Sequence, residues 1–228
     1  MTEAINIIIK YATEADVLKL SLIEVLSFPS SRYLSNTFPN AELPTLQTFK
    51  AILLYEHLAS AHAHVLAGVD PMINDLIAYS RWTIPREYGY EQDALTTLSD
   101  DALLKMADPL PYAPRPINKE IYKAYGAFID RKRAVHITQH DMVLDMLCVL
   151  PDYQGKGIGT RFLKWGMDKA DANNARIYLE ATLEGYPLYL KYGWKVVEEF
   201  VLDYEKYGGA GSQKFVLMMR EPQTGENM

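Results

Sequence analysis

Residues 142–181 constrain the fold most, because they read as a strand, a glycine turn, a helix and a second strand. Apolar residues fill both alternating faces of the first strand at 142–150, where Asp145 is the only charge. Such a strand is typical of the middle of a sheet covered on both sides. The turn at 154–159 leads into an amphipathic stretch and a strand at 176–181. This order predicts an α/β fold with helices packed on a central sheet.

Shorter patterns on either side extend this sheet. On the N-terminal side we expect a strand at 5–11, a helix at 17–26 capped by Thr13 and Asp16, a loop at 29–46, a helix at 49–66, and a hairpin of strands at 65–69 and 75–84. On the C-terminal side we expect a helix at 118–132 capped by Asn118, the helix after the turn reaching about 173, a short helix at 185–191, and paired strands at 196–203 and 214–220.

The stretch at 86–116 contains four prolines and reads as an insertion with short, interrupted structure. A chain of 228 residues that is 49% hydrophobic can bury a single core. We therefore expect one domain over 1–220 and a flexible tail at 221–228.

The charge and cysteine content narrow the classes of partner. A net charge of -6 without a basic run weighs against nucleic acid and anionic membranes. Cys148 is the single cysteine, and the first residues lack the basic region of a secretion signal. The longest apolar run, near 142–151, is far shorter than the ~20 residues of a membrane helix. We expect a cytoplasmic protein.

The turn at 154–159 is the strongest candidate binding feature. Gly155, Gly157 and Gly159 alternate where the strand gives way to the helix, so backbone amides can approach a ligand closely. The helix dipole and Lys156 both favour an anion such as phosphate at this end. The alternative is that the glycines only make a tight turn and let the helix pack on the sheet.

Spacing separates the turn from two known phosphate motifs. A P-loop needs its lysine after the last glycine, whereas Lys156 lies between glycines. A dinucleotide fingerprint would need its third glycine at Thr160 or at Phe162. Both motifs fail, although Glu180 at a strand end resembles the acid that binds ribose, which leaves the dinucleotide alternative open.

Residues 147–159 (LCVLPDYQGKGIG) resemble motif A of the GNAT superfamily of acetyl-CoA-dependent N-acetyltransferases, with Gln154, Gly157 and Gly159 on its conserved positions. The likeness continues through 178–181 (YLEA) and 187–194 (PLYLKYGW). Residues 12–16 and 81–85 are similar to fungal members, whereas 86–116 has no counterpart.

This resemblance implies a mixed central sheet flanked by helices, with splayed central strands that bind acyl-CoA. It implies that the backbone of the first strand pairs with the pantetheine arm and that the turn amides hold the pyrophosphate. The residues expected to bind acetyl-CoA are Leu147, Cys148, Val149, Gln154, Gly155, Lys156, Gly157, Ile158, Gly159 and Thr160.

Acetyl transfer to an amine also needs an acid for the leaving thiolate and a route for the amine's proton. By the resemblance, Tyr189 is the acid. The alternative for Tyr189 is a ring that only packs beside Leu188 and Trp194. Asp145 is the expected base, on the strand face of Leu147 and Val149 by alternation. Glu180 and a chain of waters are the other candidates.

Neither the single cysteine nor the histidines at 57–64 are expected to take part in catalysis or metal binding. Cys148 alternates away from Asp145 and reads as a core residue rather than a nucleophile. His57, His62 and His64 are read as lying on one helix without the spacing of a metal pair, so no metal is expected.

The resemblance predicts direct transfer of an acetyl group to a primary amine of a small molecule or peptide, by a monomer or homodimer. The alternative is a non-catalytic acyl-CoA-binding module or sensor, which would not need Tyr189.

Overall fold

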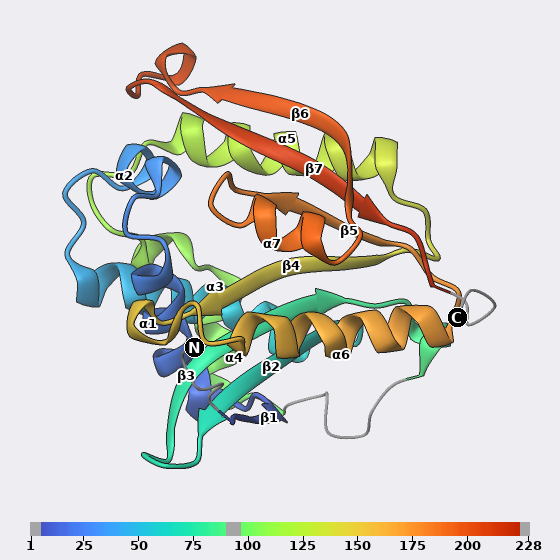
Figure 1. Ribbon diagram of the computed structural model, residues 1–228. Helices are drawn as coiled ribbons and strands as arrows, with labels where there is room; N and C mark the ends of the chain where they lie inside the picture. The colour runs from blue at the N-terminus through green and yellow to red at the C-terminus, as the bar shows by residue number, and fades with distance from the viewer. Residues whose placement is uncertain (1–5, 90–96, 224–228) are drawn as a thin grey trace. The chain divides into compact units, whose positions relative to one another are not determined.

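The computed structural model of the protein describes residues 6–89 and 97–223. Over these residues, seven strands are hydrogen-bonded into one sheet in the order β1-β2-β3-β4-β5-β7-β6 (Figure 1). Strands β4 and β5 run parallel, whereas β1–β2, β2–β3, β5–β7 and β6–β7 are antiparallel. The mixed sheet flanked by helices confirms the predicted fold class.

The strands are β1 (Ile8–Tyr11), β2 (Ala63–Asp70), β3 (Asp75–Thr83), β4 (Met142–Val149), β5 (Ile177–Ala181), β6 (Lys195–Asp203) and β7 (Ser212–Arg220). The α-helices are α1 (Val17–Ser27), α2 (Arg32–Thr37), α3 (Leu43–Ala59), α4 (Asp100–Ala107), α5 (Lys119–His136), α6 (Ile158–Ala172) and α7 (Tyr186–Lys191). No helix of these described residues is long and apolar enough to cross a membrane.

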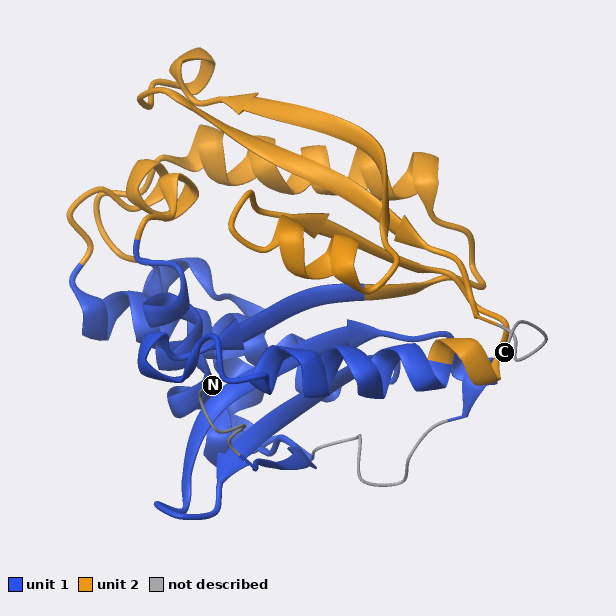
Figure 2. Ribbon diagram, in the orientation of Figure 1, with its two compact units in different colours: residues 1–29, 42–113, 144–169 blue, residues 30–41, 114–143, 170–228 orange. Residues whose placement is uncertain are grey.

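The chain groups into two compact units (Figure 2). Unit 1 comprises Met1–Pro29, Glu42–Ala113 and Leu144–Lys169, and unit 2 comprises Ser30–Ala41, Pro114–Val143 and Ala170–Met228. Strand β4 and helix α6 each contribute residues to both units. One domain over 1–220 stays a prediction.

In unit 1, helices pack on both faces of the β2–β3 hairpin. Helices α1 and α3 pack against each other and share a core with Tyr79 of β3. Helix α6 packs on the face that carries Trp82, where a Cβ on Gly166 would come within 2.2 Å of the indole. Only glycine fits there, so Gly166 is the residue that brings this helix close to the sheet.

The boundary between α3 and β2 differs from the expected one. A helix at 49–66 was predicted, but α3 runs from Leu43 to Ala59 and β2 begins at Ala63. Pro44 fits in the first turn of α3, where its missing N–H is no loss, so the helix starts earlier than the prolines suggested. The expected loop at 29–46 also contains α2, whose Ser31 hydroxyl accepts a hydrogen bond from the Leu34 N–H at 3.2 Å.

The stretch at 86–116 contributes to the core of unit 1. It forms α4, and its buried residues Leu98 and Ala102 belong to the cluster of α1 and α3. Ser99 caps α4, and its hydroxyl donates to the Glu14 carboxylate at 2.6 Å. Regular structure there is short, as expected, but it packs on α3 instead of standing apart. The part of this stretch at 90–96 lies outside the described residues.

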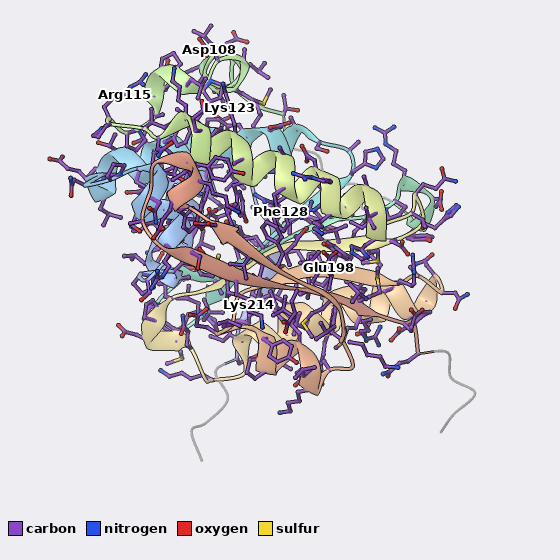
Figure 3. All side chains as sticks on the ribbon, turned by 90° about the horizontal axis from the view of Figure 1, so that it is seen from above. Asp108, Arg115, Lys123, Phe128, Glu198 and Lys214 are labelled. Atoms are coloured by element: carbon purple, nitrogen blue, oxygen red, sulfur yellow. The ribbon has the colours of Figure 1, made fainter. Side chains whose placement is uncertain are left out.

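In unit 2, helix α5 covers one face of β5, β6 and β7 (Figure 3). Its Phe128 ring stacks on Phe200 with centroids 3.6 Å apart, beside Glu198, which pairs with Lys132 and His136. The Asn118 side chain accepts hydrogen bonds from two N–H groups of the first turn, both at 3.1 Å, which confirms the predicted cap.

Part of the predicted tail is held in unit 2. The Gln223 N–H donates to the Asp171 carboxylate at 2.8 Å, and the Arg220 guanidinium binds both oxygens of the same carboxylate at 2.7 Å. Residues 221–223 are thus tied to the end of α6, and 224–228 lie outside the described residues.

Candidate functional site

The turn between β4 and α6 has the backbone conformation that its glycines require. Gly155 and Gly157 have φ of 72° and 79°, a left-handed region that favours glycine. A Cβ added at either position would meet no atom within 4 Å. Close packing does not explain these two glycines, because that role falls to Gly166. The Cβ positions of both glycines face open space, just before the start of α6.

The Gln154 side chain fastens this turn to the end of β4. Its Nε2 donates to the Val149 carbonyl oxygen at 3.0 Å. The Ser27 hydroxyl of α1 reaches the same oxygen at 3.0 Å and shares its proton with the Ile23 carbonyl at 2.7 Å. The Val149 carbonyl is therefore engaged within unit 1, and one N–H of the Gln154 side chain ties the turn to the end of β4.

The start of α6 carries positive charge. The helix is 15 residues long, and its first amides point out of the helix with the positive end of its dipole. The Lys156 ammonium lies over the Tyr153 ring, 5.3 Å from the centroid, and the Arg161 guanidinium donates to Asn6 at 2.6 Å. Free amides, a helix dipole and two cations fit an anion of phosphate type.

Asp145 lies in the middle of β4 and is partly buried. The Thr83 hydroxyl at the end of β3 donates to its Oδ2 at 2.7 Å. Cys148 is fully buried in the core cluster that includes Tyr79 of β3, and Met146 packs against the same cluster. The opposite orientation of Asp145 along β4 stays a prediction.

A buried charge cluster surrounds Tyr79. Its hydroxyl donates to the Glu24 carboxylate at 2.5 Å, and Lys50 pairs with the other carboxylate oxygen at 2.6 Å. Burial acts to raise the pKa of Glu24, but Lys50, Arg81 and the Tyr79 hydrogen bond together hold that pKa below its ordinary value. Burial and the Glu24 charge raise the pKa of Cys148, which is fully buried as expected of a core residue.

Glu180 is committed to an ion pair. Both of its carboxylate oxygens accept hydrogen bonds from Arg133 of α5, at 2.9 Å and 2.8 Å, and its side chain is only 8% exposed. A buried, bidentate pair of this kind leaves the carboxylate poorly suited to accept a proton or a ribose hydroxyl. The structure therefore weakens both roles that the sequence left open for Glu180.

Tyr189 projects from the short helix α7 in unit 2. The Tyr189 ring packs edge-on against Trp194, with ring centroids 5.9 Å apart. The backbone N–H of Trp194 donates to the backbone carbonyl of Tyr189 at 3.2 Å. Trp194 is 1% exposed. A Cβ on Gly185 would lie 3.1 Å from Cε2 of the ring. The ring thus packs against both Trp194 and the backbone of Gly185.

Three supporting residues escaped sequence reasoning: Ser27, Thr83 and Gly185. Ser27 and Gly185 stand in no motif, and the resemblance of 81–85 gave Thr83 no role. Each acts through a partner distant in sequence or through a missing side chain. For Gly185, the glycine just before Tyr186 and Pro187 was the one available sequence signal, because Gly185 is the N-cap of α7.

The three histidines do not share a helix, contrary to expectation. His57 lies in the last turn of α3, whereas His64 lies in β2 and hydrogen-bonds the Tyr11 hydroxyl at 2.8 Å. Across 6–89 and 97–223, no group of three or more His, Cys, Asp or Glu residues is arranged to hold a metal ion.

Residues 94–203 match the profile of the family described as "Acetyltransferase (GNAT) domain". This range includes the turn, Asp145 and Tyr189. A comparison with curated protein sequences gives no significant match.

Solved structures of acetyltransferases share the fold over nearly the whole chain. One from Corynebacterium glutamicum, described as "histone acetyltransferase HPA2 and related acetyltransferase", has a TM-score of 0.60 at 16% identity and covers 96% of this chain and 98% of its own. A Drosophila melanogaster polyamine N-acetyltransferase that forms N-acetylagmatine has a TM-score of 0.54 at 11% identity, covering 95% and 100%. A mosquito protein described as arylalkylamine N-acetyltransferase like 5b has a TM-score of 0.52 at 14% identity, with the same coverage.

These proteins come from bacteria and insects, so the likeness to fungal members stays a prediction. The chain has the GNAT fold, and residues 94–203 carry the sequence pattern of the GNAT acetyltransferase domain.

Proposed function

We propose that the protein is an N-acetyltransferase that moves the acetyl group of acetyl-CoA directly to a primary amine in the cytoplasm. The observation that carries this proposal is the turn at 154–159, where two left-handed glycines face open space at the positive end of α6. Backbone amides in that arrangement fit the pyrophosphate of a coenzyme A thioester. The match of 94–203 to the GNAT acetyltransferase domain supports the same reading.

In the proposed reaction the amine nitrogen attacks the thioester carbonyl, a C–N bond forms, and the C–S bond breaks. Backbone groups of Leu147 and Cys148 hold the pantetheine arm, while the Val149 carbonyl is already engaged by Gln154. A backbone N–H that polarises the carbonyl in such reactions contributes roughly 3 kcal/mol at the transition state.

The protons are assigned to two side chains. Asp145 accepts the proton that the amine loses, directly or through water, and Tyr189 gives its proton to the departing thiolate. A phenol of pKa ~10 donates to a thiolate whose thiol has pKa ~8.5 only when it is held in place. The packing of Tyr189 against Trp194 supports such a fixed position.

The proposed acceptor is a small cationic amine. A net charge of -6 concentrates cations around the protein. The Drosophila protein of the same fold is described as a polyamine N-acetyltransferase and the mosquito protein as an arylalkylamine N-acetyltransferase-like protein, which makes both amine classes reasonable first substrates.

The test is an incubation with acetyl-CoA and a panel of spermidine, agmatine, tyramine, an aminoglycoside and a lysine peptide, with released thiol measured. Amine-dependent thiol release and an acetylated amine in the mass spectrum are expected. Tight acetyl-CoA binding without thiol release from any amine would instead support the acyl-CoA sensor. Absence of binding in calorimetry would contradict both.

A further inference from the structure

The partly buried Thr83 hydroxyl donates a hydrogen bond to the carboxylate that we propose as the base. Thr83 is the last residue of β3, and its Oγ1 lies 2.7 Å from Oδ2 of Asp145. Both side chains are partly buried, so water can still reach the pair. We propose that Thr83 is a positioning residue that orients Asp145 for proton acceptance. This inference rests on the proposed function.

The length and direction of the contact indicate that Asp145 accepts. A hydroxyl has one proton, and at 2.7 Å the bond is in the normal range of O–H···O bonds. Donation to a carboxylate favours its ionised form over the protonated form. A hydrogen bond also selects one rotamer of Asp145, which turns the carboxylate's remaining lone pairs in one direction.

Two other buried acids are paired with cations. Glu24 is buried and neutralised by Lys50 at 2.6 Å, and Glu180 is bound by Arg133 through both oxygens. A hydroxyl donor orients a carboxylate without itself adding an opposite charge, whereas a bidentate arginine both orients and neutralises it. The contact with Thr83 thus suits a group that must take up a proton and release it in each turnover.

The backbone of Thr83 is part of the regular β2–β3 pairing. It pairs with Ala63 of β2, and the register of the hairpin is regular from Tyr79 to Thr83. A β-branched side chain on a strand has restricted χ1, so the hydroxyl stays near one position. Valine in its place keeps the branch and removes only the donor, and serine keeps the donor.

The experiment compares Thr83→Val, Thr83→Ser, Asp145→Asn and the double variant Thr83→Val/Asp145→Asn in the full chain. With the amine that gives the fastest thiol release, we expect Thr83→Val to lower kcat about tenfold with an unchanged KM for acetyl-CoA, and Thr83→Ser to stay within about twofold of the wild type. In the Asp145→Asn background, Thr83→Val should have no further effect, because Thr83 acts only through Asp145.

A second readout does not depend on turnover. In carbon-labelled protein, NMR follows the titration of the Asp145 carboxyl carbon, and we expect Thr83→Val to move its midpoint upward by about one pH unit. Thr138→Val is the matched control, because Thr138 makes the same kind of bond to Asp141, at 3.0 Å. It should leave the Asp145 titration unchanged.

The outcomes separate the two proposals. An unchanged Asp145 midpoint in Thr83→Val, or additive losses in the double variant, would overturn the role of Thr83. Failure of the wild type to release thiol with any amine would overturn the proposed function, while an upward shift of the Asp145 midpoint would still establish the contact with Thr83.

Discussion

The ring of Tyr189 stands edge-on to the indole of Trp194, with centroids 5.9 Å apart and the two planes inclined by 62°. Edge-to-face packing of this kind holds a phenol by its ring. We expect Tyr189→Phe to keep the packing and to lower kcat about tenfold or more, with little change in acetyl-CoA affinity. Steady-state thiol release and calorimetry measure the two quantities separately.

A tyrosine elsewhere in unit 2 provides the control for this variant. Tyr207 is 37% exposed, and Tyr207→Phe removes one phenolic hydroxyl, as Tyr189→Phe does, but at the protein surface. Its kcat should equal that of the wild type. Equal rates for Tyr189→Phe and Tyr207→Phe would reduce Tyr189 to the packing role that the sequence left open.

Gly185→Ala tests whether the position of the Tyr189 ring matters. The added Cβ would lie 3.1 Å from Cε2 of Tyr189, so the ring must shift by a few tenths of an ångström. We expect Gly185→Ala to lower kcat severalfold. In the Tyr189→Phe background, Gly185→Ala should lower kcat no further. Gly126→Ala is the control, because a Cβ there meets no atom within 4 Å and alanine favours the helix α5 by about 0.5 to 1 kcal/mol. A loss of activity in Gly126→Ala as large as in Gly185→Ala would show that the effect is general.

The glycine turn should respond to backbone conformation and not to side-chain volume. Gly157 has φ of 79°, and nothing lies within 4 Å of an added Cβ. Gly157→Ala therefore strains the turn by about 1 to 2 kcal/mol, and acetyl-CoA affinity should fall about tenfold. Gly157→Asn, which tolerates left-handed backbone better, should lose less. Calorimetric titration with acetyl-CoA compares them, and equal affinities for all three proteins would argue against the turn as the binding element.

Acid should destabilise the fold in part through Asp141. Burial acts to raise its pKa, but hydrogen bonds from Arg176 and Thr138 outweigh burial and hold the pKa below its ordinary value. A carboxylate with a lowered folded pKa stabilises the protein above about pH 4 and loses that contribution as pH falls through the folded pKa. Urea unfolding of Asp141→Asn should show a free energy lower by about 2 kcal/mol at neutral pH and a weaker dependence on pH below about 4. Asp203→Asn, at an exposed strand end, is the control, and an identical acid dependence in wild type and Asp141→Asn would contradict the expectation.

The sequence predicted what depends on local pattern. The strand, turn and helix from Met142 to Ala172 appeared where periodicity and the glycines placed them, and the cap at Asn118 formed as expected. Capping and turn chemistry act over a few residues, so a single sequence carries them.

What escaped prediction depends on contacts distant in sequence. Glu180 meets Arg133 across 47 positions and Thr83 meets Asp145 across 62, and no periodicity encodes either pair. The α3 boundary was misjudged because Pro44 lies in the first turn of the helix, where the prolines had suggested a loop. The acetyl-CoA residues and Tyr189 stay predictions that binding and kinetics must test.

Direct acetyl transfer is tested most directly by a single turnover with acetyl-CoA labelled in its acetyl group, an active amine and excess protein. We expect the label to appear on the amine nitrogen at the rate of thiol release, with none retained on the protein. Label found on Cys148, in free acetate, or still on coenzyme A after the amine is added would contradict direct acetyl transfer.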